Sequence, residues 1–146
     1  MKKIYLILII LLLSGCTATN KYIPKGYIEK EEHYDKEGFQ DYTDYAKYIY
    51  NTKDIVSNNK DYNIVTSDNI EDLTEYFNEF KLVMESQNRL KEYDFNINQI
   101  TEGDYFKIIT KEYTDTSSNE DSKFYNFSVY LFDTETLTLY YIHNNI

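Results

Sequence analysis

The chain has 146 residues, of which 25 are acidic and 15 are basic, so its formal net charge at pH 7 is −10. This length is typical of a single domain with one hydrophobic core. A strongly acidic surface is repelled by phosphate backbones, which argues against nucleic acid as a partner. Because Cys16 is the only cysteine, an intramolecular disulfide and a site built from several thiolates are both excluded.

The first sixteen residues have the order of a cleavable signal. Lys2 and Lys3 are followed by ten apolar residues, 4–13, and then by small residues before Cys16. A membrane-spanning helix needs about 20 apolar residues, so this run is too short for a retained transmembrane anchor. An ordinary secretory signal cleaved elsewhere is the other alternative, but it leaves the position of the single cysteine unexplained.

The segment Leu13-Ser14-Gly15-Cys16 resembles the lipobox of bacterial lipoprotein precursors. In that family a diacylglycerol is attached to the cysteine, and signal peptidase II cuts just before it. The resemblance therefore implies cleavage between Gly15 and Cys16, lipidation of Cys16, and a protein held on a bacterial cell membrane, facing outside the cytoplasm. It leaves a mature chain of 131 residues with 13 basic and 25 acidic residues, a net charge of −12. The diacylglycerol on Cys16 is then the membrane contact, since two acyl chains anchor a protein stably.

The segment after the cysteine has little periodicity and contains the only proline, Pro24. It predicts a tether of ten residues, which would reach up to about 33 Å from the bilayer. We therefore expect a signal peptide over residues 1–15, a lipidated N-terminus and tether over 16–26, and a single domain over 27–146.

Apolar and aromatic residues at helical spacing predict a first amphipathic helix over residues 39–50. Its face comprises Phe39, Tyr42, Ala46 and Ile49, flanked by Tyr45 and Tyr48. Residues 62–65 are predicted as a short strand or as an extended lead-in to the next element.

A long helix from Asp68 to Lys91 is the best-defined predicted element. Asp68 is expected as its N-cap, with Glu71 three residues later as in a capping box, and Arg89 suits its C-terminal end. Its apolar face comprises Ile70, Leu73, Phe77, Phe80 and Met84, widened by Tyr76 and Val83.

Three consecutive antiparallel strands are predicted over residues 105–113, 124–132 and 137–143. A polar, mobile loop over 114–123 and a turn over 133–136 join them. Their alternating apolar positions are Phe127, Val129 and Leu131 in one strand and Leu137, Leu139 and Tyr141 in the next.

This order of elements predicts an α+β domain, with one long and one short helix packed on one face of a three- to four-stranded antiparallel sheet. The order is similar to that of cystatin-like and NTF2-like small folds. That similarity implies an architecture and carries no residue-level function to this chain.

The acidic run around His33 has part of the spacing of the calcium loop of EF-hand proteins. Counting from His33, the potential ligands fall at His33, Asp35, Glu37, Asp41 and Asp44, with Gly38 at the turn position. Position 1 should be Asp, position 12 is usually Glu, and no helix is predicted before the loop. The sequence therefore predicts no metal site, and a charged segment leading into a helix is the alternative that it favours.

The remaining candidates are a histidine and a set of tyrosines. His143 ends the last predicted strand, where it is either a solvated residue or part of a site between helix and sheet. Tyr45, Tyr48 and Tyr50 belong to a chain with 17 tyrosines and no tryptophan. They either line the edge of the core or form a surface for a partner.

No phosphate-binding glycine loop, Gly-x-Ser-x-Gly or His-Glu-x-x-His motif occurs in the chain, so we predict no catalytic residue and no cofactor. The sequence favours a membrane-anchored, non-catalytic binding module for a protein or an envelope polymer. The alternative is a small ligand-binding domain or hydrolase with a site between helix and sheet.

Overall fold

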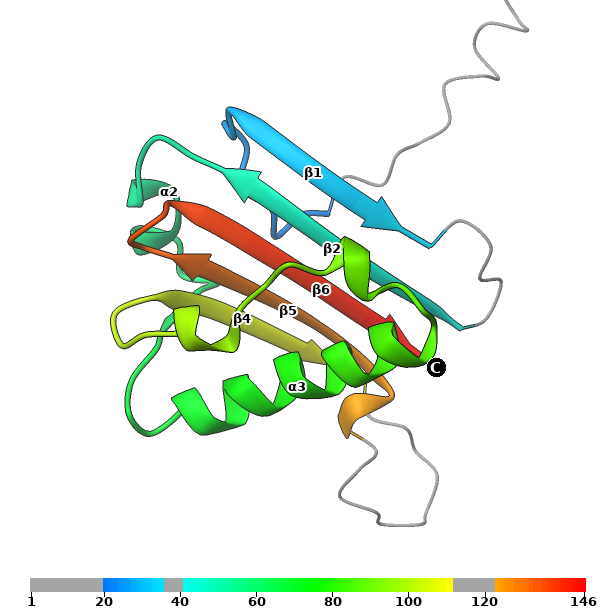
Figure 1. The fold of residues 1–146 in the computed structure, drawn as a ribbon. Helices are drawn as coiled ribbons and strands as arrows, with labels where there is room; N and C mark the ends of the chain where they lie inside the picture. Colours follow the sequence, from blue (N-terminus) through cyan, green and yellow to red (C-terminus); the bar gives the residue numbers. More distant parts are fainter. Residues whose placement is uncertain (1–19, 36–40, 112–122) are drawn as a thin grey trace, which may run out of the picture.

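A computed structural model describes residues 20–35, 41–111 and 123–146 (Figure 1). Six strands form one antiparallel sheet in the order β1-β2-β6-β5-β4-β3. The strands are β1 (Glu29–Tyr34), β2 (Tyr42–Ile49), β3 (Asn63–Ile64), β4 (Tyr105–Thr110), β5 (Asn126–Asp133) and β6 (Thr138–Asn145). The helices are α2 (Asp54–Ser57), α3 (Ile70–Ser86) and the 3₁₀ turns η1 (Leu90–Glu92) and η2 (Ile97–Gln99). The α+β class is confirmed, but the sheet has six strands rather than three to four.

The long helix α3 lies across one face of the sheet, as its apolar stripe predicts (Figure 1). The predicted stripe residues Leu73, Phe77, Phe80 and Met84 are fully buried. They belong to one cluster with Phe127, Val129 and Leu131, the alternating positions predicted in β5. We call this side of the sheet the α3 face.

The ends of α3 differ from the prediction. The helix begins after Asn69 rather than Asp68, and no side chain caps its first turn. It ends at Ser86 because Asn88 takes a positive φ of 58°, which turns the chain out of the helix. Arg89 therefore lies beyond the helix, and the chain continues into η1.

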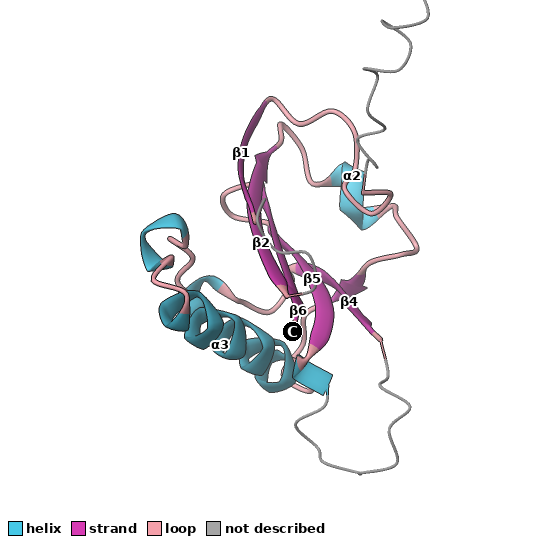
Figure 2. Cartoon of the chain, turned by 90° about the vertical axis from the view of Figure 1, so that its right-hand side faces the viewer, coloured by secondary structure: helices cyan, strands magenta, loops and turns pink. Residues whose placement is uncertain are grey.

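The opposite face of the sheet is also covered, which the sequence analysis did not predict. Figure 2 shows α2 on the side of the sheet away from α3. The second buried cluster comprises Ala46, Tyr48, Tyr50, Val56, Tyr62, Tyr130, Phe132, Leu139 and Tyr141. Tyr22 and Ile23 pack against it, so residues from Asn20 onward belong to the folded domain rather than to a free tether. We call this side the tyrosine face.

The predicted helix over residues 39–50 is wrong, because β2 occupies Tyr42–Ile49. This strand lies between β1 and β6 and is buried on both faces. Apolar residues on both faces of a central strand produce a mixture of spacings that imitates the period of a helix. Phe39 lies outside the described residues.

The charged segment before it forms the edge strand β1, which pairs with β2 over six residues. Its sequence Glu-Lys-Glu-Glu-His-Tyr is polar on both faces, which suits an exposed edge because charges there oppose pairing with another chain.

The predicted strand at 62–65 is confirmed in part as β3, and the turn after β5 is confirmed at residues 134–137. Most of the predicted loop over 114–123, like the signal segment, lies outside the described residues. Within the described residues, no helix is long and apolar enough to cross a membrane.

Candidate functional site

The alternation of β1 distributes its polar side chains between the two faces of the sheet. Glu31 and His33 lie on the α3 face, whereas Lys30, Glu32 and Tyr34 lie on the tyrosine face. The result is two separate polar clusters around the same pair of strands.

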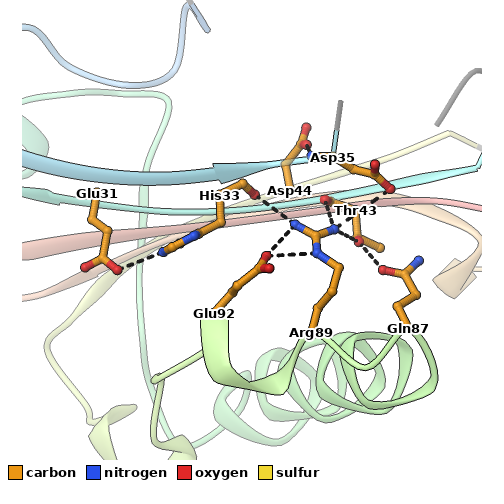
Figure 3. A network of polar contacts seen from close by, with 8 residues as sticks. All are labelled: Glu31, His33, Asp35, Thr43, Asp44, Gln87, Arg89 and Glu92. Atoms are coloured by element: carbon orange, nitrogen blue, oxygen red, sulfur yellow. Dashed lines mark hydrogen bonds and ion pairs between the residues drawn. The ribbon is translucent and has the colours of Figure 1, made fainter. Parts of the chain in front are cut away.

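Arg89 is the centre of the cluster on the α3 face (Figure 3). Its guanidinium donates to the backbone oxygen of Thr43 at 3.0 Å, to the Thr43 hydroxyl at 2.9 Å and to Glu92 at 2.9 Å. It also lies 3.9 Å from the Asp35 carboxylate, and its side chain is only 17% exposed. Because these donors are used within the protein, the guanidinium joins the end of α3 to β1 and β2 rather than offering itself to a ligand.

A chain of charged groups continues from His33 along the same face. His33 lies 2.7 Å from Glu31, Glu31 lies 2.8 Å from Lys47, and Lys47 lies 2.6 Å from Asp94. Hydrogen bonds from Lys47 and then His33 lower the pKa of the Glu31 carboxyl. Tyr45 ends the chain by donating to Asp94 at 2.6 Å. Each group thus has a partner inside the network.

Neither interpretation of the acidic run around His33 holds, because the run is not an EF-hand loop and the element that follows it is the strand β2 rather than a helix. His33 lies in β1 and Asp44 in β2, so these residues belong to paired strands rather than to a loop between two helices. The backbone N–H of Asp35 donates to Asp44 at 3.1 Å, and Asp41 is exposed. Glu37 and Gly38 lie outside the described residues. In the described part of the chain, no group of three metal-ligating side chains is assembled.

The tyrosine face holds a pocket of about 890 Å³ between residues 20–27 and the strands β1, β2 and β6. Its sheet side is formed by Glu32, Tyr34, Asp44, Tyr48 and Tyr141. Its other side carries Lys21 and Lys25, and Lys30 lies at its margin. We call it the tyrosine pocket.

Hydroxyl and carboxylate groups are organised on the sheet side of the tyrosine pocket. The hydroxyls of Tyr34 and Tyr48 lie 2.8 Å apart, and both donate to Glu32, at 3.1 and 2.8 Å. Burial raises the pKa of Tyr34 to about 12, so the phenol stays protonated. Burial also raises the pKa of Asp44. The pocket therefore offers neutral hydroxyls, carboxylate acceptors and aromatic rings to a polar ligand.

Tyrosine hydroxyls hold the N-terminal wall of this pocket against the sheet. Tyr50 donates to the backbone oxygen of Pro24 at 2.7 Å, and Tyr62 donates to that of Tyr22 at 2.7 Å. The hydroxyl of Tyr130 donates to Asn20 at 2.8 Å. The wall is thus fixed by three bonds from elements far apart in the sequence.

Of the two alternatives for Tyr45, Tyr48 and Tyr50, the exposed surface for a partner is wrong, because all three are buried. Tyr45 is 0% exposed, and Tyr48 and Tyr50 are each 2% exposed. Tyr45 points to the α3 face and the other two to the tyrosine face, because successive side chains of an extended chain point to opposite faces and both faces are covered here. Tyr48 still contributes to a candidate site, but as part of a pocket rather than of a flat surface.

His143 forms a pair that the sequence analysis missed, with Ser128 on the neighbouring strand. Its Nδ1 lies 2.8 Å from the Ser128 hydroxyl and 2.9 Å from the backbone oxygen of Phe127. A carbonyl oxygen only accepts, so the second contact requires a proton on Nδ1, which then cannot take one from the serine. Burial lowers the pKa of His143. The pair therefore serves the packing of β5 and β6 rather than nucleophilic catalysis.

Comparison of the chain with protein-family models, with curated proteins and with solved structures found no match. The geometry of the two faces is therefore the basis on which a function can be assigned.

Proposed function

We propose that this protein is a lipid-anchored binding module of a bacterial cell envelope, with its ligand site in the tyrosine pocket. The observation that carries the proposal is the pocket itself, in which aromatic rings, paired hydroxyls and two carboxylates converge. A concave site with a few organised polar groups is the usual form of a ligand-binding site. The ligand is a component of the envelope that reaches this face of the sheet.

The cystatin-like or NTF2-like order of elements would place a site between the long helix and the sheet. On that side, however, Phe77, Phe80 and Phe127 fill the interface and are at most 1% exposed. The geometry therefore favours the tyrosine face over the α3 face, and binding over hydrolysis.

The anchor is tested by labelling growing cells with a clickable fatty acid and by measuring the mass of the N-terminal peptide. We expect a diacylglyceryl group on Cys16 and no residues before it. Cys16→Ser should abolish labelling and either release the protein or leave the precursor uncut. Normal processing and unchanged membrane partitioning of Cys16→Ser would contradict the anchor.

The pocket is tested by native mass spectrometry of the full chain released from membranes in detergent. We expect a bound mass beyond the acyl group, and we expect Glu32→Gln/Asp44→Asn to lose it. The matched control is Asp68→Asn/Glu71→Gln, which removes two exposed carboxylates at the start of α3. Equal adducts in both double variants would show that the tyrosine pocket is not the site.

A further inference from the structure

The position of Asn20 limits the distance between the tyrosine pocket and the proposed lipid anchor. Asn20 is a wall residue of the pocket and is held by Tyr130. It follows Cys16 by four residues, which span at most about 14 Å whatever their conformation. The reach of about 33 Å expected for a free tether is therefore not available. If Cys16 carries the lipid, as the proposed function requires, the pocket is held beside the headgroups of the bilayer.

The same segment has a charge opposite to that of the rest of the protein. Residues 20–30 contain three lysines and one glutamate, a net charge of +2. The mature chain as a whole has a net charge of −12, so its other residues together have a net charge of −14. Lysines close to a membrane surface attract anionic lipids. If Cys16 carries the lipid, this basic segment begins within about 14 Å of the anchored residue.

The lysines of the pocket are not equivalent. Lys30 is 2.7 Å from Glu32 and is neutralised by it. The amino group of Lys21 lies over the ring of Tyr22, 4.6 Å from its centre. Lys25 is exposed and forms no ion pair with any residue that the structure describes. Lys21 and Lys25 are therefore the cations available to a bound anion.

The sheet side of the pocket has the opposite preference. Glu32 and Asp44 repel an anion and accept hydrogen bonds from hydroxyls, and the phenols of Tyr34 and Tyr48 add to this polar surface. A ligand that fits both sides has its negative charge at Lys21 and Lys25 and its hydroxyl groups directed toward the sheet.

We infer that the tyrosine pocket binds the headgroup of a membrane phospholipid that has a phosphodiester and free hydroxyls. The phosphate lies against Lys21 and Lys25, and the hydroxyls donate to the Asp44 carboxylate, because both oxygens of Glu32 already accept from Tyr34, Tyr48 and Lys30. Anchor and pocket then contact the same leaflet, and headgroup binding fixes the orientation of the domain on the membrane. The inference depends on the proposed lipidation and names the ligand class of the proposed site.

The test is the rate of lysine acetylation in the lipidated full chain, reconstituted into vesicles and read by mass spectrometry. Three vesicles are compared: phosphatidylcholine alone, and phosphatidylcholine with about 20% phosphatidylglycerol or phosphatidylmethanol. The last two have equal charge, but only phosphatidylglycerol has hydroxyls. We expect phosphatidylglycerol to slow the acetylation of Lys21 and Lys25 about threefold more than phosphatidylmethanol does. Lys60 and Lys81, which are exposed and outside the pocket, are internal controls that should not respond.

Two outcomes would overturn the inference. Equal slowing by the two anionic lipids would show attraction to surface charge without headgroup recognition. Full slowing by water-soluble glycerophosphoglycerol, added to vesicles of phosphatidylcholine alone, would move the ligand from the membrane to the surrounding solution. Loss of the acyl group itself is seen in the protein mass before the assay, so failure of the anchor is distinguished from failure of headgroup binding.

Substitutions in the pocket test which residues produce the preference for phosphatidylglycerol over phosphatidylmethanol. Asp44→Asn should remove the difference between phosphatidylglycerol and phosphatidylmethanol while the protein stays anchored, and Asp68→Asn should keep it. Lys25→Gln should reduce the effect of phosphatidylglycerol on the acetylation rate of Lys21, whereas Lys60→Gln should not. An unchanged lipid preference in both Asp44→Asn and Lys25→Gln, with a native circular dichroism spectrum, would contradict the site.

Discussion

The two faces of the sheet differ in their proportion of phenylalanine to tyrosine. Among the described residues, the cluster on the α3 face contains five buried phenylalanines and four buried tyrosines, whereas the cluster on the tyrosine face contains five buried tyrosines and one phenylalanine. Phenylalanine fills space and requires no partner, which suits an interface closed by a long helix. Tyrosine also needs a hydrogen-bond partner when it is buried. On the second face that partner is often the N-terminal segment.

This difference indicates that the two faces have different roles. The α3 face supplies the packing that a domain without disulfides needs for stability. The tyrosine face holds a less regular segment by its backbone oxygens and leaves a pocket beneath it. Substitutions on the two faces should therefore have effects of different size and kind.

The largest effect is expected from Phe77→Ala on the α3 face. Phe77 is 0% exposed and stacks on Phe95 with ring centres 4.3 Å apart. Removal of a buried ring leaves a cavity, and the free energy of unfolding should fall by about 3–5 kcal/mol. Denaturation in urea measures it, and Leu82→Ala on the exposed side of α3 should change stability by less than about 0.5 kcal/mol. Equal losses would show that the α3 face is not the main core.

A smaller effect is expected from Arg89→Met, which removes the connection between the end of α3 and the strands. The substitution leaves Thr43 and Glu92 without their donor. The free energy of unfolding should fall by about 2 kcal/mol, as for hydrogen bonds to charged groups. Lys91→Met, two residues away and exposed, is the control for loss of a positive charge. If both variants lose the same stability, the Arg89 network does not join the layers.

On the tyrosine face, Tyr62→Phe tests a single hydroxyl. The ring stays buried while the bond to the Tyr22 backbone oxygen is lost. The expected loss is about 1 kcal/mol in the free energy of unfolding, measured by the same denaturation. Tyr125→Phe, at a residue that is 45% exposed, should be neutral. A neutral Tyr62→Phe would mean that the hydroxyl does not hold the segment.

The smallest effect is a dependence of stability on pH. Because burial lowers the pKa of His143, the unfolded chain binds a proton there more readily than the folded chain. Stability should therefore fall as the pH decreases from about 7.5 to about 6, through the ordinary range of histidine. His143→Gln should flatten this dependence when denaturation is repeated across the range. An equal slope in the variant would assign the effect to another group.

The sequence was most informative where one face of an element is buried. The stripe of α3 and the alternation of Phe127, Val129 and Leu131 have a single period each, and both were predicted correctly. β2 is buried on both faces and β1 is charged on both, so neither has the alternation of a half-buried strand. These two strands were missed for that reason.

The candidate site could not be predicted because it is assembled from distant segments. Glu32, Asp44 and Tyr141 come from β1, β2 and β6, and their proximity depends on the strand order. The N-terminal wall was interpreted as a tether because two of the three tyrosine bonds that hold it go to its backbone oxygens, which carry no signal in the side chains. The abundance of tyrosine is evident from the sequence, but the face of the sheet to which each ring points can be assigned only once the strands are known.

The most direct test of this account is hydrogen exchange of residues 20–28 in the full chain, read by mass spectrometry. The wild type is compared with a triple variant, Tyr50→Phe/Tyr62→Phe/Tyr130→Phe. We predict that this segment is protected in the wild type and exchanges at least about tenfold faster in the triple variant, while α3 is unchanged. Exchange of the wild-type segment at the rate of an unfolded peptide would contradict the claim that tyrosine hydroxyls hold it on the sheet.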